Sequence, residues 1–200
     1  MLIAERLVFL KIHLEQVTDE TFPDFFAIYL EENGEESFYP AQLREKMAQH
    51  AINPEHSIVR GIWQTETGAV LGYCEVRNVN EPEWETGIYI LEPYRFQGVG
   101  KTAVPLFLDE LAAMGRHSVI ARILPKNQAS RKLFEGLGAK LMGMEVPSGA
   151  LSDELLESEV VSRKEGAGPE ELARLQLIED LIRATKWEVC VYRIGWPPDK

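Results

Sequence analysis

Apolar residues follow two periods along the chain, and these periods predict its strands and helices. Alternating or continuous apolar runs predict strands over residues 7–14, 57–64, 69–77, 84–91, 118–124, 140–146 and 187–194. Apolar residues at helical spacing predict four helices, which end at Asn33, Asn53, Gly115 and Gly138. The predicted order is therefore β-α-α-β-β-β-α-β-α-β, followed by a further strand at the end of the chain.

A helical insertion, residues 147–186, separates the last two predicted strands. Residues 152–163 predict an acidic helix, and a break at 166–169 precedes a second helix with Leu172, Leu175, Ile178 and Ile182 on one face. We expect one domain over residues 1–200 with an α/β (α+β) fold, a mixed and mostly antiparallel seven-stranded sheet flanked by helices. Parallel pairing is expected only around the third and fourth helices, where crossovers exist.

A glycine-containing turn between the fourth strand and the third helix is the first candidate for chemistry. Residues 85–102 run from a strand pattern through Gly98 and Gly100 into an amphipathic helix. At such a turn, unpaired backbone N–H groups and the positive end of the helix dipole point at one spot. That spot suits a phosphate or pyrophosphate group.

Three interpretations of this turn compete. The first is nucleotide binding, which has two possible patterns, and the second is a purely structural turn. Gly100-Lys101-Thr102 resembles the end of a nucleotide-binding P-loop, but that pattern needs glycine where Arg95 stands. The dinucleotide pattern G-x-G-x-x-G fails because residue 103 is alanine. A tight turn with close helix–strand packing would explain Gly98 and Gly100 equally well if they stood alone.

A second motif downstream gives the third interpretation. Residues 95–100 match [QR]-x-x-G-x-[GA], and residues 127–139 match N-x-x-S-x-x-L-[FY]-x-x-x-G-[FA]. In this order, with a strand between them, the two motifs resemble the signature of the GNAT superfamily of acyl-CoA-dependent N-acetyltransferases. Ala4-Glu-Arg-Leu7 and Glu85-Thr-Gly87 resemble the branch that includes ribosomal-protein N-terminal and small-amine acetyltransferases. The resemblance covers residues 1–146 and the last strand, and it implies a GNAT-like sheet.

The resemblance implies an acetyl-CoA site around the glycine turn. The N–H groups of residues 97–102 would hold the pyrophosphate, and the pantetheine arm would lie along the strand before the turn. The family usually has one more residue after Pro93, so the strand contact is open to a shift of one residue. Asn127 is expected both to cap its helix and to meet the pantetheine or acetyl end. The implied contacts are Tyr89, Ile90, Leu91, Gln97, Gly98, Val99, Gly100, Lys101, Thr102, Asn127, Ser130 and Phe134.

The activity that the resemblance implies is direct transfer of an acetyl group from acetyl-CoA to a primary amine in a ternary complex. The amine has to lose a proton, because the pKa of an alkylammonium is about 10.4. Glu85, on the strand before the turn, is the first candidate for the catalytic base, and Glu75 on the neighbouring strand is the second. The alternative for either glutamate is a solvated strand position.

The general acid is harder to assign from the sequence. Many family members place a tyrosine near the thioester sulfur, seven residues after the asparagine, but here Phe134 has no proton to donate. Members with a glutamate base on the preceding strand have it where Arg122 stands. An acyl-CoA-binding module without catalysis is therefore the alternative function. The remaining proton donors considered are Tyr73, Tyr89, Tyr192 and Cys190, and strand tyrosines are more often core than catalytic.

Composition narrows the partners and the location. A net charge of −11 without a basic stripe argues against nucleic acid, and a small-molecule or peptide amine fits this charge better. Cys74 and Cys190 lie singly in strand patterns and the four histidines lack ligand spacing, so neither a disulfide framework nor a metal site is expected. No apolar run approaches the roughly 20 residues of a membrane span, and no cleavage-site pattern is present, so we expect a cytoplasmic protein.

The insertion at 147–186 stands where the family normally has a short hairpin loop. Loops of this length are usually functional or disordered, and the two amphipathic patterns argue against disorder. One hypothesis is that the insertion covers the acceptor side of the cleft or forms a homodimer surface. The other is a docked decoration without a role in the reaction.

Overall fold

A computed structural model describes residues 10–33, 41–145 and 188–198, together with 160, 162–164, 167–169, 171–172 and 175–176. Its strands form one seven-stranded sheet in the order β1-β2-β3-β4-β5-β7-β6. The strands are β1 (Ile12–Gln16), β2 (Ser57–Gln64), β3 (Val70–Arg77), β4 (Glu85–Ile90), β5 (Ser118–Ile123), β6 (Lys140–Glu145) and β7 (Val189–Gly195). The sheet is therefore mixed and mostly antiparallel, as the sequence predicts.

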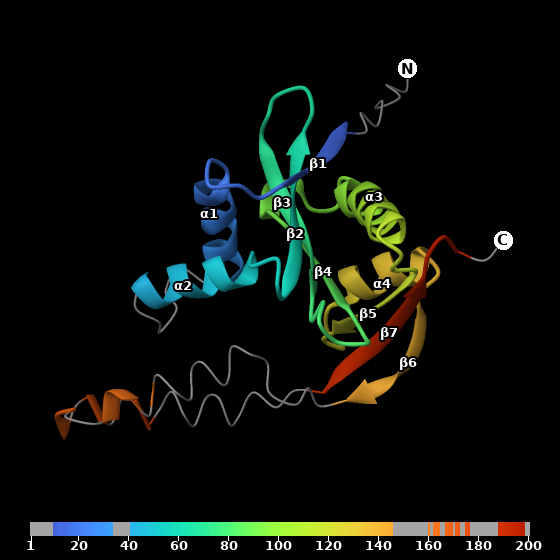
Figure 1. Cartoon of the computed structure of the whole chain (residues 1–200). Helices are drawn as coiled ribbons and strands as arrows, with labels where there is room; N and C mark the ends of the chain where they lie inside the picture. The colour runs from blue at the N-terminus through green and yellow to red at the C-terminus, as the bar shows by residue number, and fades with distance from the viewer. Residues whose placement is uncertain are drawn as a thin grey trace, which may run out of the picture.

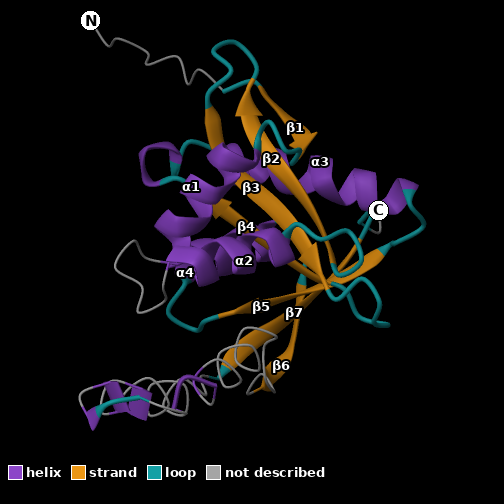
Figure 2. Ribbon diagram, turned by 60° about the vertical axis from the view of Figure 1, so that its left-hand side comes forward, coloured by secondary structure: helices purple, strands orange, loops and turns teal. Residues whose placement is uncertain are grey.

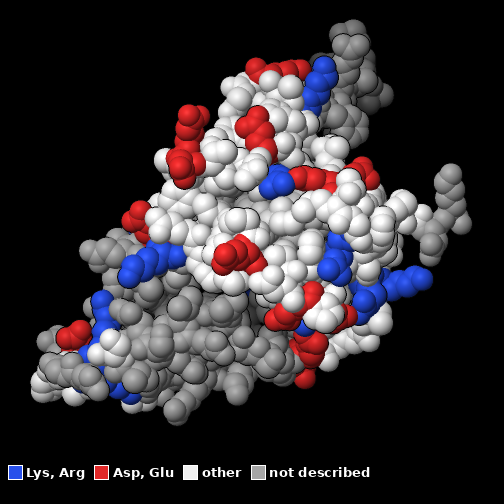
Figure 3. Space-filling model, viewed as in Figure 1, with Lys and Arg blue, Asp and Glu red and all other residues white. Residues whose placement is uncertain are grey.

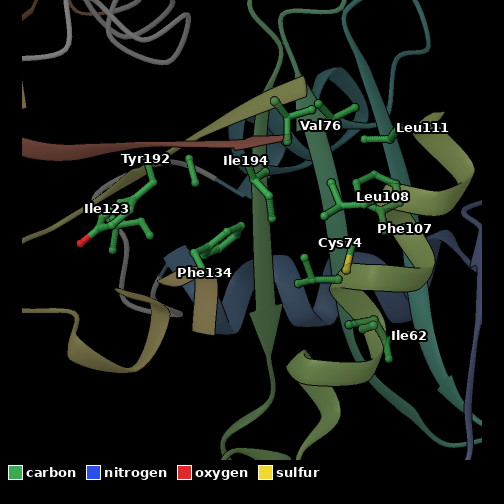
Figure 4. Packing of buried hydrophobic residues seen from close by; sticks show 14 of the residues in the cluster. Ile62, Cys74, Val76, Phe107, Leu108, Leu111, Ile123, Phe134, Tyr192 and Ile194 are labelled. Carbon is green, nitrogen blue, oxygen red and sulfur yellow. The ribbon is translucent and has the colours of Figure 1, made fainter. Parts of the chain in front are cut away.

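Helices cover both faces of this sheet. α1 (Phe22–Asn33) and α2 (Ala41–Ala51) lie on one face, and α3 (Val99–Ala113) and α4 (Gln128–Gly136) lie on the other (Figure 1). The larger core lies beneath α3 and α4, where Phe107 and Leu111 are almost completely buried (Figure 4). Burial of one such side chain contributes about 1.5–3 kcal/mol. A smaller cluster lies beneath α1, where the rings of Phe25 and Tyr73 meet edge to face with centroids 5.1 Å apart.

Most of the predicted elements are found within two residues of their expected bounds. The first strand differs more, because it begins at Ile12 and continues to Gln16, beyond the predicted end at residue 14. Its length follows its partner, since β1 pairs with β2 from Ile12↔Gln64 to Gln16↔Arg60. Residues 7–9 of the predicted strand, and the predicted start of the second helix at Ser37, lie outside the described residues.

The order of the strands corrects one expectation about parallel pairing. β4 and β5 are parallel, as predicted from the crossover through α3. β5 and β6 also point the same way, but β7 lies between them and is antiparallel to both. The prediction of parallel pairing around the fourth helix is therefore wrong, because β7 lies next to β5.

The β4–β5 pair is joined at one end only. Glu85 lies opposite Ile120, and the Ile120 N–H donates to Trp84 O at 2.9 Å. Beyond this point β4 continues beside β3 and β5 continues beside β7, so the two strands diverge toward their C-terminal ends (Figure 2). The sheet thus consists of two halves that are joined at a closed end and separated by a V-shaped gap.

Parts of the helical insertion are also described. Residues 160, 162–164, 169, 171–172 and 175–176 are helical, within or next to the two predicted helices, and Val160 and Leu175 are buried. The rest of the insertion lies outside the described residues, so its proposed roles stay predictions. No helix among the residues that the structure describes is long and apolar enough to cross a membrane.

Candidate active site

The gap-facing edge of β4 carries backbone groups without a strand partner in the described part of the chain. Leu91 N–H donates to Leu71 O at 2.9 Å on the β3 side. Hydrogen-bonded positions alternate along an antiparallel pair, so the odd-numbered residues of β4 bond to β3. The backbone groups of Ile88 and Ile90 therefore point into the gap, because β5 pairs with β4 only at Glu85.

The backbone groups that face the gap belong to alternate residues of the predicted contact segment 89–91. The backbone groups of Tyr89 and Leu91 face β3, and the Tyr89 hydroxyl lies on the α1 face, where it donates to Glu31 Oε1 at 3.1 Å. Ile90 lies on the gap edge as expected, and its carbonyl accepts a hydrogen bond from Arg95 Nε at 2.8 Å. A carbonyl oxygen has a second lone pair, so this contact leaves it able to accept another donor.

The glycine turn opens α3 beside this edge. Gly98 is the N-cap residue with φ +84°, a left-handed conformation that glycine adopts without steric cost, and no side chain caps the helix. The first hydrogen bond of the helix runs from Thr102 N–H to Gly98 O at 3.3 Å. Three N–H groups therefore precede the hydrogen-bonded part of the helix, those of Val99, Gly100 and Lys101.

Gly100 is the point where β4, α3 and α4 meet. A Cβ atom at this position would lie 3.0 Å from Leu133 Cδ2 of α4 and 3.4 Å from Ile90 Cδ1 of β4. A side chain there would have to push one of these neighbours aside. The N–H groups of the α3 terminus are thus held close to the gap edge, as an anion-binding site beside an extended ligand requires.

The predicted cap of α4 is confirmed. Asn127 Oδ1 accepts a hydrogen bond from the Ser130 N–H at 3.1 Å. The Asn127 side chain is exposed and its amide N–H₂ group remains available as a donor. Gln97 is also exposed, and its Nε2 donates to Pro93 O at 2.6 Å, which stabilises the turn itself.

The side chains expected near the thioester sulfur either lie in the core or are hydrogen-bonded to other residues. Phe134 is 2% exposed and lies among the buried side chains beneath α4 (Figure 4). The Tyr192 hydroxyl donates to Glu135 Oε1 at 2.6 Å and accepts from Arg131 Nε at 3.0 Å, both on α4. Cys190 is buried in the same core.

Charged side chains lie on the face of the sheet that α1 covers, at the closed end of the gap. Both carboxylate oxygens of Glu85 are engaged, one by Arg77 Nη2 at 2.9 Å and the other by Arg122 Nη1 at 2.7 Å. Arg122 Nε donates to Glu145 on β6. The Glu85 side chain is 14% exposed. Glu85 is therefore positioned as the counter-ion of two guanidinium groups.

Glu75 lies beside Gly87 on the same face. The two residues are opposite each other in the β3–β4 register, and a Cβ on Gly87 would lie 3.1 Å from Glu75 Oε1. Burial raises the pKa of Glu75, the Arg77 charge 3.4 Å away lowers it, and Glu85 raises it further, with a net rise. A carboxylate with a raised pKa is better matched to accepting a proton near neutral pH.

A second acidic group from α1 reaches this face. The Tyr73 hydroxyl donates to Glu32, and burial raises the pKa of both side chains. Glu31, the preceding residue of α1, accepts a hydrogen bond from the Tyr89 hydroxyl. Acidic side chains of α1, β3 and β4 thus lie along this face, with Glu85 at the closed end of the gap and Glu31 near the C-terminal end of β4. On the molecular face shown in Figure 3, Lys and Arg are scattered among Asp and Glu and do not form a stripe.

A cavity of about 250 Å³ lies elsewhere, at the N-terminal ends of β4 and β5. Its lining includes Trp84, Arg116 and Arg193, and the Arg116 guanidinium lies 4.2 Å from the centroid of the Trp84 ring. Arg193 is paired with Glu83. The lining of this cavity does not include Ile88 or Ile90, so it is separate from the free edge of β4.

Comparison with known proteins agrees with this geometry. A family model described as an acetyltransferase (GNAT) domain matches residues 11–140. The chain therefore belongs to the GNAT acetyltransferase family, whose members are acyltransferases. No curated protein sequence matches the chain.

Solved structures share the fold at low sequence identity. RimL, a ribosomal L7/L12 alpha-N-protein acetyltransferase in complex with coenzyme A, is 14% identical with a TM-score of 0.63, over 94% of this chain and 96% of that one. Spermidine N-acetyltransferase from Vibrio cholerae, with coenzyme A and spermine, is 14% identical with a TM-score of 0.62, over 92% and 95%. RimJ from Mycobacterium smegmatis, with CoA-disulfide, is 13% identical with a TM-score of 0.61, over 94% and 85%. The shared fold is thus one that holds coenzyme A in these proteins.

Proposed function

We propose that the protein transfers an acetyl group from acetyl-CoA directly to a cationic primary amine in a ternary complex. One observation carries the proposal. A free strand edge at Ile88 and Ile90 runs from the N-terminus of α3 to the closed end of the gap, where the Glu75 carboxylate lies. An anion site, an edge for amide groups and a half-buried carboxylate thus follow one another in that order.

The donor is proposed to lie along this edge. Its pyrophosphate would accept hydrogen bonds from the N–H groups at the start of α3, and its pantetheine amides would pair with Ile88 and Ile90 as an added strand does. From Ile90 to Glu85 the strand spans about 17 Å, at roughly 3.3 Å per residue. The arm can only run toward the closed end, so the thioester would lie beside Gly87. The contacts proposed around this path are Tyr89, Leu91, Gln97, Gly98, Val99, Gly100, Lys101, Thr102, Asn127, Ser130 and Phe134.

Glu75 and Glu85 compete for the role of base. Glu85 is the choice that the sequence favours, but each of its oxygens already accepts a hydrogen bond from a guanidinium. Glu75 has one cation at 3.4 Å and a raised pKa, and its Oε1 lies over Gly87. We therefore assign proton removal from the amine to Glu75, and to Glu85 the positioning of the cations around it.

The acidic border of this face supports a cationic acceptor. Glu32 of α1 and Glu75 of β3 lie on the same face, where an incoming ammonium group would replace lost hydration with carboxylate contacts. The structures that share the fold include proteins named for a ribosomal-protein N-terminus and for spermidine, and both acceptors are amines. A peptide N-terminus and a polyamine are therefore the two acceptor types to compare first.

The test is release of the coenzyme A thiol across a panel of amines. Polyamines, aminoglycosides and peptides with free N-termini are each supplied with acetyl-CoA, and acetylated products are identified by mass spectrometry. Turnover of at least one cationic amine above the rate with N-acetylated controls supports the proposal. Tight acetyl-CoA binding by calorimetry without turnover of any amine would instead support the acyl-CoA-binding module.

A further inference from the structure

The transfer reaction needs a group that stabilises negative charge, and the tyrosine expected for this purpose is missing. The amine nitrogen uses its lone pair to form the N–C bond, and the C–S bond breaks with its electron pair on sulfur. Negative charge therefore develops on the carbonyl oxygen and then on the sulfur. Phe134 has no donor, and the Tyr192 hydroxyl is directed to Glu135 and Arg131 on α4.

Arg122 lies at the closed end of the gap, beside the position proposed for the thioester. Arg122 is two positions beyond Ile120, the β5 residue opposite Glu85. It is therefore the next β5 residue whose side chain lies on the α1 side of the sheet, which we call the acceptor face. Its guanidinium joins the two halves of the sheet at this end, since Nη1 reaches Glu85 Oε2 on β4 at 2.7 Å and Nε reaches Glu145 on β6. The side chain is 24% exposed, so the cation is only partly screened by water.

The guanidinium keeps free donors in this position. Of its five N–H groups, the described part of the chain supplies partners for one on Nε and one on Nη1, and none for those on Nη2. The hydrogen bonds to Glu85 and Glu145 fix the orientation of the planar guanidinium group. Such a preorganised donor costs little reorganisation when charge appears beside it.

We propose that Arg122 stabilises the negative charge on the thioester oxygen and on the departing thiolate, in place of proton donation by a tyrosine. The inference rests on the proposed function. In this scheme Arg122 transfers no proton. Nitrogen loses two protons, one when the ammonium becomes the attacking amine and one after the N–C bond has formed. Each passes to Glu75 and on to solvent, and the thiolate takes one proton from solvent. Glu85 and Glu145 are positioning residues that act through Arg122.

The test uses Arg122→Ala, Arg122→Lys and a matched control, Arg193→Ala. Arg193 lies on β7, on the same face of the sheet, and its ion pair with Glu83 lies away from the gap. The amine that the wild-type protein acetylates fastest serves as acceptor. We expect Arg122→Ala to lower kcat by about 10²–10³, the usual cost of removing one oxyanion donor, with little change in the Kd of acetyl-CoA. Arg122→Lys should be intermediate, and Arg193→Ala should keep the wild-type kcat.

Chemical rescue separates catalysis from a merely structural ion pair. Millimolar guanidinium should raise the kcat of Arg122→Ala in a saturable way, and it should leave Arg193→Ala and the wild-type protein unchanged. A folded Arg122→Ala protein with wild-type kcat would overturn the inference, as would a slow variant that guanidinium does not rescue. If the wild-type protein itself binds acetyl-CoA but turns over no amine, it is the proposed function that fails.

Discussion

Paired substitutions at Glu75 and Glu85 should both lower activity, but they should have opposite effects on stability. Both are changed to the isosteric glutamine. Glu75→Gln removes the proposed base, and loss of a general base typically lowers kcat by about 10²–10⁴, or about 3–5 kcal/mol in the barrier. The pKa of Glu75 is raised mainly by burial, so its charged form is unfavourable in the folded state. The glutamine variant should therefore be at least as stable as the wild-type protein at pH 8.

Glu85→Gln should lower stability, because it leaves two guanidinium groups without their shared carboxylate. Hydrogen bonds to charged groups contribute about 1.5–3 kcal/mol, and partial exposure of Arg77 places the expected loss near 2 kcal/mol. For a protein of 200 residues this corresponds to a fall in Tm of about 4–8 °C. Its kcat should fall as well, because Arg122 loses one of the two carboxylates that hold it.

The pH dependence of stability gives an independent check. A carboxyl group with a raised pKa in the folded state favours folding most at pH values below its unfolded pKa. That contribution is lost as pH rises through the folded pKa. The Tm advantage of Glu75→Gln over the wild-type protein should therefore shrink as the pH is lowered. In the wild-type protein kcat/KM should rise with pH through the same folded pKa, and in Glu75→Gln this rise should disappear.

Calorimetric Tm values and thiol release at saturating acetyl-CoA are the assays. If Glu75→Gln keeps wild-type kcat while Glu85→Gln loses activity without losing stability, the base is Glu85 and the reasoning from the two guanidinium contacts is refuted.

Three further perturbations follow from the site. Asn127→Ala removes the cap of α4 and should cost about 1 kcal/mol of stability, seen in urea unfolding; an unchanged midpoint would contradict the capping contact. Gly100→Val should weaken acetyl-CoA binding and lower stability by about 1–3 kcal/mol, because its Cβ would start 3.0 Å from Leu133; Gly136→Ala, with open space around it, is the control. The KM of a cationic amine should rise with ionic strength more than that of a neutral one, and equal slopes would argue against an acidic acceptor face.

The parts of the site that follow from local sequence were predictable. The glycine turn, the α3 helix behind it and the Asn127 cap depend on φ preferences and on hydrogen bonds within three or four residues. Such short-range rules can be read directly from the sequence pattern. The family motifs rest on the same segments, which is why the family was recognised from them.

The parts that depend on pairing between distant segments were not predictable in detail. Whether Tyr89 or its neighbours face the gap depends on the register of β4 with β3, where a shift of one residue reverses every backbone group. The two guanidinium contacts of Glu85 join residues 8 and 37 positions away in the sequence. The sequence placed Glu85 ahead of Glu75 but could not show the partners of either carboxylate. Only the fold shows that Glu85 is a counter-ion shared by two guanidinium groups and that Glu75 has one such neighbour.

The divergence of β4 and β5 accounts both for the free edge of β4 and for the long side chain that crosses from β5 to β4. Where pairing stops after Glu85, the backbone of β4 loses its partner and becomes the edge on which we place the donor. On the acceptor face the same widening separates the side chains of the two strands, and a short side chain on β5 would no longer reach β4. The long Arg122 side chain does reach across, with Nη1 at 2.7 Å from Glu85. The widening in which we propose the thioester lies therefore also explains why the cation that joins β5 to β4 stands on a long side chain.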